Sequence, residues 1–127
     1  MIGKPNREGF HTITPYLMVP EVEPVVKFLQ NAFDADETHR TTGGSGGTHI
    51  EMKIGDSMLM LGGGNNTVAE PAPASFFLYV ADVDTVYHSA LDAGATTVLE
   101  PADDLFGEKR GAGAKDPFGN DWYFGRH

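Results

Sequence analysis

Two side chains that can exchange protons, His49 and Glu51, lie two residues apart in a run typical of a β-strand. Alternate residues of a strand face the same side of the sheet, so we expect both side chains on one face. A histidine beside a carboxylate can act as a general base whose ring the carboxylate orients. The pair could instead ligate a metal ion together with His39, or form a solvated or hydrogen-bonded pair on an open sheet face. The sequence leaves these three interpretations open.

The same alternation predicts a set of cleft-facing side chains on the other strands. They combine aromatic rings, methionines and a few hydroxyls, which is the usual composition of a small-molecule site. A basic residue, Arg110, follows in a predicted loop and could close over an anionic ligand, with a solvated loop as the alternative. The predicted ligand-binding residues besides Arg110 are Thr14, Tyr16, Met58, Met60, Ser75, Phe77, Tyr79 and Tyr123.

Composition narrows the classes of chemistry and partner. The chain has no cysteine, which excludes disulfides, thiolate metal sites and a cysteine nucleophile. The glycine-rich stretches at 43–47 and 62–64 lack the Gly-Lys-Ser/Thr ending of a phosphate loop. A net charge of -9 argues against a nucleic-acid partner, and no apolar run reaches the length of a membrane span or a signal peptide. We therefore expect a cytoplasmic protein that binds neither nucleic acid nor membrane.

An internal repeat organises the chain. The segment Val19–Lys27 matches Val80–His88 at an offset of 61 residues, with valines and acids in register. A second match sets Lys53–Leu59 against Pro117–Tyr123 at an offset of 64. Two matches in the same order indicate a duplicated module.

Each module has the pattern of a strand, a helix and three further strands. Helical spacing of valines, Leu29 and Phe33 predicts a helix over 21–33, and Asp82 is expected to cap a second helix that Gly94 ends. The predicted strands are 12–19, 37–42, 48–54 and 57–61 in the first module, and 75–80, 96–99, 111–115 and 121–124 in the second. The predicted organisation is one domain, with module one at about 11–62, a linker at about 63–74 and module two at about 75–125.

Several stretches resemble the vicinal-oxygen-chelate superfamily (glyoxalase/bleomycin-resistance/dioxygenase proteins), in particular its PhnB-like branch. The resemblance implies an α+β fold in which two tandem βαβββ modules form curved sheets around a cleft, with helices on the convex face. It also implies a homodimer. The stretches that carry it are 13–17, 54–61, 78–84 and the Asp-Pro-Phe-Gly-Asn segment at 116–120.

The resemblance also bears on metal binding. Metal-dependent members use His or Glu at up to four strand positions, which here fall on Thr14, Met60 (or Leu59), Ser75 and Tyr123. These are poor ligands for hard or borderline divalent ions, so no metal cofactor is expected at the usual positions. We expect a metal-independent protein that binds a small molecule, sequestering an aromatic or cationic compound. The alternative is a lyase, isomerase or dioxygenase type of enzyme that uses His49 and Glu51 as acid–base groups or metal ligands.

Overall fold

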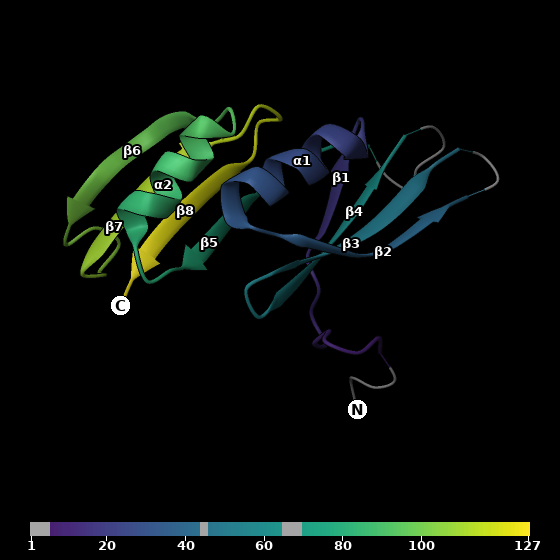
Figure 1. Ribbon diagram of the computed structural model, residues 1–127, viewed down its shortest axis with the longest axis horizontal. Helices are drawn as coiled ribbons and strands as arrows, with labels where there is room; N and C mark the ends of the chain where they lie inside the picture. Colours follow the sequence, from purple (N-terminus) through teal and green to yellow (C-terminus); the bar gives the residue numbers. More distant parts are fainter. Residues whose placement is uncertain (1–5, 44–45, 65–69) are drawn as a thin grey trace. The chain divides into compact units, whose positions relative to one another are not determined.

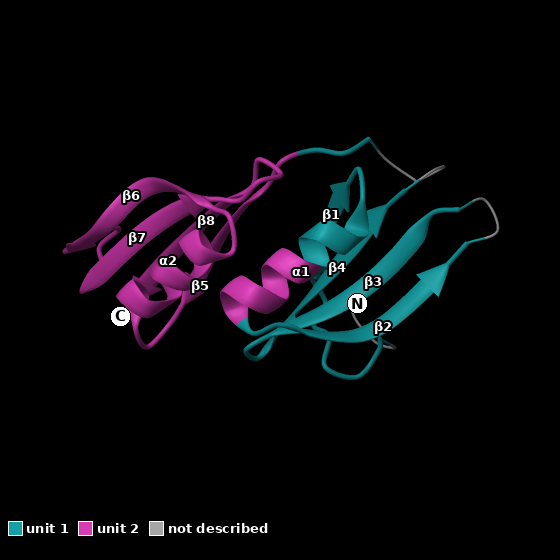
Figure 2. Ribbon diagram, turned by 45° about the horizontal axis from the view of Figure 1, so that its top comes forward, with its two compact units in different colours: residues 1–26, 34–72 teal, residues 27–33, 73–127 magenta. Residues whose placement is uncertain are grey.

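The computed structural model describes residues 6–43, 46–64 and 70–127, which fold into two compact units (Figures 1 and 2). Unit 1 comprises Met1–Val26 and Asp34–Ala72, and unit 2 comprises Lys27–Phe33 and Pro73–His127. The predicted loop at 43–47 and linker at 63–74 lie partly outside the described residues. No helix within the described ranges is long and apolar enough to cross a membrane.

The sheet of unit 1 has four strands in the order β1-β4-β3-β2. β1 pairs in parallel with β4, and the other pairs are antiparallel. β1 begins at Tyr16 instead of the predicted Thr12, because Pro15 has no N–H for the ladder, although its carbonyl accepts a bond from Met60 N at 2.9 Å. The strands of unit 1 are β1 (Tyr16–Val19), β2 (Asp36–Thr42), β3 (Thr48–Ile54) and β4 (Ser57–Gly63).

Strand alternation in unit 1 separates a buried face from a more accessible one. On β1, Leu17 and Val19 are buried while Tyr16 and Met18 are not. On β4, Leu59 and Leu61 are buried while Met58 and Met60 are half-buried. The predicted cleft-facing residues of these strands therefore share the accessible side.

Unit 2 repeats the topology with the strand order β5-β8-β7-β6. Its strands are β5 (Ser75–Tyr79), β6 (Thr96–Asp103), β7 (Arg110–Lys115) and β8 (Asp121–Arg126). Helix α2 (Val83–Asp92) packs on β6, β7 and β8, and it begins as predicted because the Asp82 carboxylate accepts a bond from Thr85 N at 3.1 Å. Gly94 follows the helix with a φ of 115°, a conformation that favours glycine.

Helix α1 (Val22–Phe33) contributes to both units, since its residues up to Val26 belong to unit 1 and its later residues to unit 2. In unit 2 the Phe33 ring lies 4.9 Å from the Trp122 ring and 5.8 Å from that of Phe124. Trp122 and Phe124 are fully buried, so these rings form the aromatic core of unit 2.

The segment Asp116–Asn120 is a structural turn between β7 and β8. The buried Asp116 carboxylate accepts four hydrogen bonds, from the amides of Phe118 and Asn120, from Asn120 Nδ2 and from Trp122 Nε1. Asn120 Oδ1 in turn accepts from Ala74 N at 3.0 Å and ties the start of β5 to the turn. Because every donor is part of unit 2, the motif serves the fold of that unit.

The predicted fold of two βαβββ modules is confirmed. One register requires correction: the sequence match set Leu59 against Tyr123, whereas the ladders pair Tyr16 with Met60 and Phe77 with Tyr123. Met60 is therefore the counterpart of Tyr123, at an offset of 63. The β7–β8 turn is longer than the Gly55-Asp56 turn, and matching residues straight through the two turns shifts the alignment by one.

Candidate functional site

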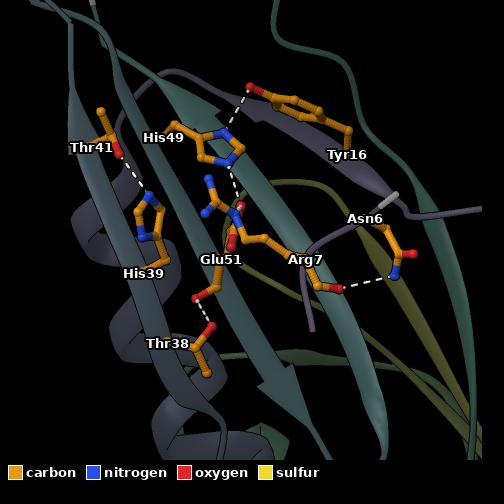
Figure 3. Close-up of polar contacts among 8 residues, drawn as sticks. All are labelled: Asn6, Arg7, Tyr16, Thr38, His39, Thr41, His49 and Glu51. Atoms are coloured by element: carbon orange, nitrogen blue, oxygen red, sulfur yellow. Dashed lines mark hydrogen bonds and ion pairs between the residues drawn. The ribbon is translucent and has the colours of Figure 1, made fainter. Parts of the chain in front are cut away.

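Glu51 is a buried carboxylate at the centre of β3, with only 1% of the residue exposed. Its Oε2 accepts hydrogen bonds from Arg7 Nε at 3.0 Å and from His49 Nε2 at 3.0 Å (Figure 3). A charge this deeply buried is tolerated because two cationic or polar donors satisfy it. Of the third interpretation, a solvated or hydrogen-bonded pair, the structure shows the hydrogen bond between His49 and Glu51, while the Glu51 carboxylate itself is buried.

The His49 ring lies between the Glu51 carboxylate and the Tyr16 hydroxyl (Figure 3). Its Nδ1 is 3.1 Å from Tyr16 Oη, and the two rings meet edge to face at 5.5 Å. An ionised carboxylate only accepts, so His49 Nε2 must carry a hydrogen. In the neutral ring Nδ1 then accepts from the Tyr16 hydroxyl. We call Tyr16, His49 and Glu51 the acid–base chain.

Gly62 leaves the space that the acid–base chain needs. Strand β4 lies between β1 and β3, and Gly62 is the ladder partner of His49. A Cβ at Gly62 would come within 2.9 Å of Tyr16 Cε1, so any other residue would displace the ring. The absence of a side chain at this position lets Tyr16 reach across β4 to His49.

The electrostatics of the site favour an ionised Glu51. Burial acts to raise the pKa of the carboxyl, but the hydrogen bonds from His49 and Arg7 and the charge of Arg7 act in the opposite direction. The net result is a pKa below the ordinary value of 4.5. Glu51 is thus a permanent acceptor at neutral pH that holds His49 in one orientation.

Sequence reasoning missed Arg7, which lies 44 residues before its partner in a segment without strand or helix periodicity. Asn6 Nδ2 donates to Phe10 O at 2.7 Å, and Phe10 is buried. Gly9 lies beside Met58 on β4. The segment before β1 therefore packs on the sheet of unit 1 and brings Arg7 to Glu51, a contact that no local pattern signals.

His39, the third histidine considered for a metal site, has another partner. Its Nε2 lies 2.8 Å from Thr41 Oγ1, and its ring centroid is 6.5 Å from that of His49. Among residues 6–43, 46–64 and 70–127, no group of three or more His, Cys, Asp or Glu side chains is arranged to hold a metal ion. His39, His49 and Glu51 are therefore not arranged as the three metal ligands of the second interpretation.

The accessible side of unit 2 carries a cluster of aromatic rings. The Phe77 ring lies 5.2 Å from that of Tyr79 and 5.5 Å from that of Phe106, and Phe106 lies 5.5 Å from Tyr123. Phe77, Tyr79 and Phe106 are 42%, 67% and 40% exposed. We call these four residues the aromatic face.

Sequence reasoning missed two loop residues here: Phe106, which belongs to the aromatic face, and Glu108 beside it. Phe106 has a φ of 62°, a strained conformation for a bulky residue, and it holds its ring over Gly111. Glu108 accepts from Tyr79 Oη at 2.9 Å and lies 3.0 Å from His127 Nδ1, and its side chain is only 10% exposed. The hydrogen bond to Glu108 raises the pKa of Tyr79. A carboxylate is thus fixed at the edge of the aromatic face.

Arg110 begins β7 and is engaged by carboxylates of unit 2. Its Nε and Nη2 donate to Asp84 at 2.8 and 3.0 Å, and its Nη1 donates to Asp103 at 3.0 Å. These bonds raise its pKa further above the ordinary value, and an anionic ligand would compete with both acids.

The remaining predicted residues lie on or beside the strands. Thr14 precedes β1 and its hydroxyl donates to His11 O at 3.3 Å. Ser75 is the exposed first residue of β5. Met60 pairs with both Tyr16 and Glu51 on the neighbouring strands, so it lies beside the acid–base chain.

Comparison with known proteins assigns the family. The model of the Glyoxalase/Bleomycin resistance protein/Dioxygenase superfamily matches residues 9–124. The chain belongs to this superfamily. An uncharacterised protein of Mycobacterium bovis is 34% identical over 125 residues, a match that covers 90% of this chain and 82% of the relative.

Several solved structures share the fold. A gene product of Arabidopsis thaliana is 23% identical with a TM-score of 0.72, over 89% of this chain and 96% of that one. The fosfomycin resistance protein FosX of Mesorhizobium loti is 17% identical with a TM-score of 0.65, over 89% and 88%. A PhnB protein of Bacillus cereus is 17% identical with a TM-score of 0.62, over 91% and 98%.

Proposed function

We propose that this chain is a metal-independent small-molecule-binding protein of the glyoxalase/bleomycin-resistance type that sequesters a planar, cationic aromatic compound. The observation that carries the proposal is the aromatic face, four rings joined by three consecutive ring contacts, of which Phe77, Tyr79 and Phe106 are exposed. Exposed aromatic clusters of this kind mark binding sites more often than ordinary surface.

The chemistry of the aromatic face favours a flat cation. Faces of Phe and Tyr rings attract cations and stack with planar π systems. Glu108 supplies a fixed negative charge at the edge, where a ligand cation could replace the contact with His127. A net charge of -9 adds long-range attraction for cations.

The family supports this proposal in a coarser way, because its name includes bleomycin resistance and FosX is named as a fosfomycin resistance protein. We also propose a place in the PhnB-like branch, supported by the sequence stretches named above and the fold shared with the PhnB protein. A homodimer in the cytoplasm stays a proposal as well. The exposed edge strands β2 and β6 favour self-association, because the backbone N–H and C=O groups at an open sheet edge can pair with a strand of another chain.

Equilibrium binding to the planar dye cations ethidium and acriflavine tests the proposal, with anionic fluorescein as the charge control and EDTA present throughout. We expect saturable binding of a cation, weakened about 10-fold by Phe77→Ala or Phe106→Ala, since a lost aromatic contact contributes about 1.4 kcal/mol. Ile13→Ala removes an exposed apolar residue of unit 1 and should leave binding unchanged. Absence of saturable binding, or binding that appears only when EDTA is replaced by an added metal ion, would overturn the proposal.

A second candidate function rests on a different observation. The acid–base chain of unit 1 joins a phenol, an imidazole and a buried carboxylate by consecutive hydrogen bonds, which is the arrangement of an acid–base enzyme of the isomerase or lyase type. Loss of turnover in a stably folded Tyr16→Phe or His49→Gln variant would identify this function.

A further inference from the structure

We infer that Tyr16 is the proton-transferring catalytic residue of unit 1 and that the site accepts a small 2-oxo acid, a carboxylate beside an enolisable ketone. The inference deepens the second candidate function and rests on it. It is independent of the ligand proposed for the aromatic face, because it uses different residues of a different unit.

Exposure assigns the roles along the acid–base chain. Glu51 is buried, the His49 side chain is 28% exposed, and Tyr16 is 46% exposed. A ligand on the accessible side of the sheet therefore meets the Tyr16 hydroxyl at the outer end of the chain. His49 and Glu51 are positioning residues that act through Tyr16.

The protons of the proposed reaction are balanced within the acid–base chain. A substrate carbon next to the ketone gives its proton to Tyr16 Oη while the hydroxyl proton moves to His49 Nδ1. The electron pair of the broken C–H bond stays on the substrate as an enolate, and the Glu51 carboxylate stabilises the imidazolium that forms. Return of a proton to the enolate restores the chain, so an isomerisation needs no oxidant, reductant or co-reactant.

Arg7 supplies the recognition of the carboxylate. Only its Nε is engaged among the described residues, by Glu51, and its side chain is 57% exposed. A guanidinium has four further N–H donors on its two Nη atoms, in a fork that matches a carboxylate in a bidentate way. The Glu51 contact orients this fork beside the acid–base chain (Figure 3). In a chain of net charge -9, such a local cation is needed to attract an anionic substrate.

Two measurements test the inference in sequence. First, ¹⁵N NMR of His49 reports its tautomer. We expect the Nε2–H form, with a change in the Nδ1 shift in Tyr16→Phe and no such change in His39→Gln, which alters a histidine of the neighbouring strand. A His49 ring in the Nδ1–H form, or one insensitive to Tyr16→Phe, would overturn the acid–base chain and with it the second candidate function.

Second, ¹H NMR in D₂O follows exchange of the methyl hydrogens of pyruvate, with EDTA present and far-UV circular dichroism as the fold control for each variant. We expect exchange faster than in buffer alone and a loss of about 100-fold in Tyr16→Phe and His49→Gln, the typical contribution of general acid–base catalysis. Arg7→Met should raise the half-saturating pyruvate concentration about 10-fold, while ethyl pyruvate, which has no carboxylate, should exchange equally with both proteins.

The outcomes separate the two levels of the inference. Protein with the expected His49 tautomer but no accelerated exchange of pyruvate would overturn the substrate class and leave the acid–base chain in place. Exchange that EDTA abolishes, or that His39→Gln removes as fully as His49→Gln does, would overturn Tyr16 as the proton carrier in favour of a metal site.

Discussion

Units 1 and 2 have the same strand order, yet the corresponding ladder positions of β3 and β7 carry opposite kinds of residue. Glu51 pairs with Met60, and its counterpart Gly113 pairs with Tyr123. His49 pairs with Gly62, and its counterpart Gly111 pairs with Gly125. Unit 1 thus has two titratable side chains where unit 2 has two glycines.

Aromatic rings occupy the space that the glycines of unit 2 leave. A Cβ at Gly111 would come within 2.8 Å of Phe106, and one at Gly113 within 3.0 Å of Tyr123. In both units, however, a ring from the first strand crosses a glycine of the last strand. Tyr16 lies over Gly62, and Phe77 lies over Gly125.

The duplicated backbone thus provides the same gap in both units, at a glycine of the last strand. The residues on the neighbouring strand, β3 or β7, decide which chemistry the unit can support. Glycine on the last strand lets an aromatic ring approach the next strand. A histidine and a carboxylate at that strand yield a proton-transfer chain. Glycines there admit further rings and yield an apolar surface for stacking.

The largest expected effect comes from placing the carboxylate of unit 1 into unit 2. Gly113→Glu puts the counterpart of Glu51 beside Tyr123 and Val98, whose carbon atoms are the nearest to a Cβ at this position, whereas Glu51 has the donors Arg7 and His49. We expect a loss of about 3 kcal/mol in the free energy of unfolding, because a buried unpaired charge is costly. Urea denaturation measures the loss, with Gly113→Ala as the control for the added Cβ. Equal losses in the free energy of unfolding for Gly113→Glu and Gly113→Ala would mean that unit 2 also accommodates a carboxylate.

A smaller effect is expected from closing the opening in unit 1. Gly62→Ala brings a methyl group to about 2.9 Å from Tyr16 Cε1, which displaces the ring and separates its hydroxyl from His49. Overpacking of this kind costs about 2 kcal/mol. A double-mutant cycle with Tyr16→Ala measures the coupling between the two positions. If Gly62→Ala lowers the free energy of unfolding by the same amount in the Tyr16→Ala background, Gly62 does not serve to leave room for the Tyr16 ring.

The smallest effect concerns pH. The pKa of Glu51 in the folded protein lies below its ordinary value of 4.5, so its contribution to stability is complete above about pH 5 and is lost as the pH falls through the folded pKa. Wild-type protein should exceed Glu51→Gln by about 1 kcal/mol at pH 7, since hydrogen bonds to a charged acceptor are stronger than those to an amide. Thermal unfolding between pH 3 and 7 should show the melting temperatures of wild type and Glu51→Gln converging at acid pH. A difference in melting temperature that does not change with pH would contradict the lowered pKa of Glu51.

Much of the fold followed from local patterns. The alternation in β3 predicted its limits and the burial of Ile50 and Met52. Asp82 as a helix cap was predicted from its position before an apolar stripe. The extent of β6 was underestimated, because the strand continues to Asp103 through irregular pairing that no period-2 pattern marks.

The candidate site was predicted only in part. His49 and Glu51 were identified because strand alternation places them on one face, and Tyr16 was assigned to the accessible side for the same reason. Their hydrogen bonds depend on the strand order β1-β4-β3 and on the gap at Gly62, and these are properties of the assembled sheet. Phe106 and Glu108 come from a loop whose left-handed turn places them on the aromatic face.

The sequence by itself determined the two modules, the faces of their strands and the residue types available for chemistry, because these depend on spacing along the chain. Tertiary structure decided which of those residues meet. Arg7 reaches Glu51 across 44 positions, and this contact together with that of His49 turns a carboxylate that could have been solvated into a buried, ionised acceptor. Such pairing follows from the packing of distant segments, which periodicity does not encode.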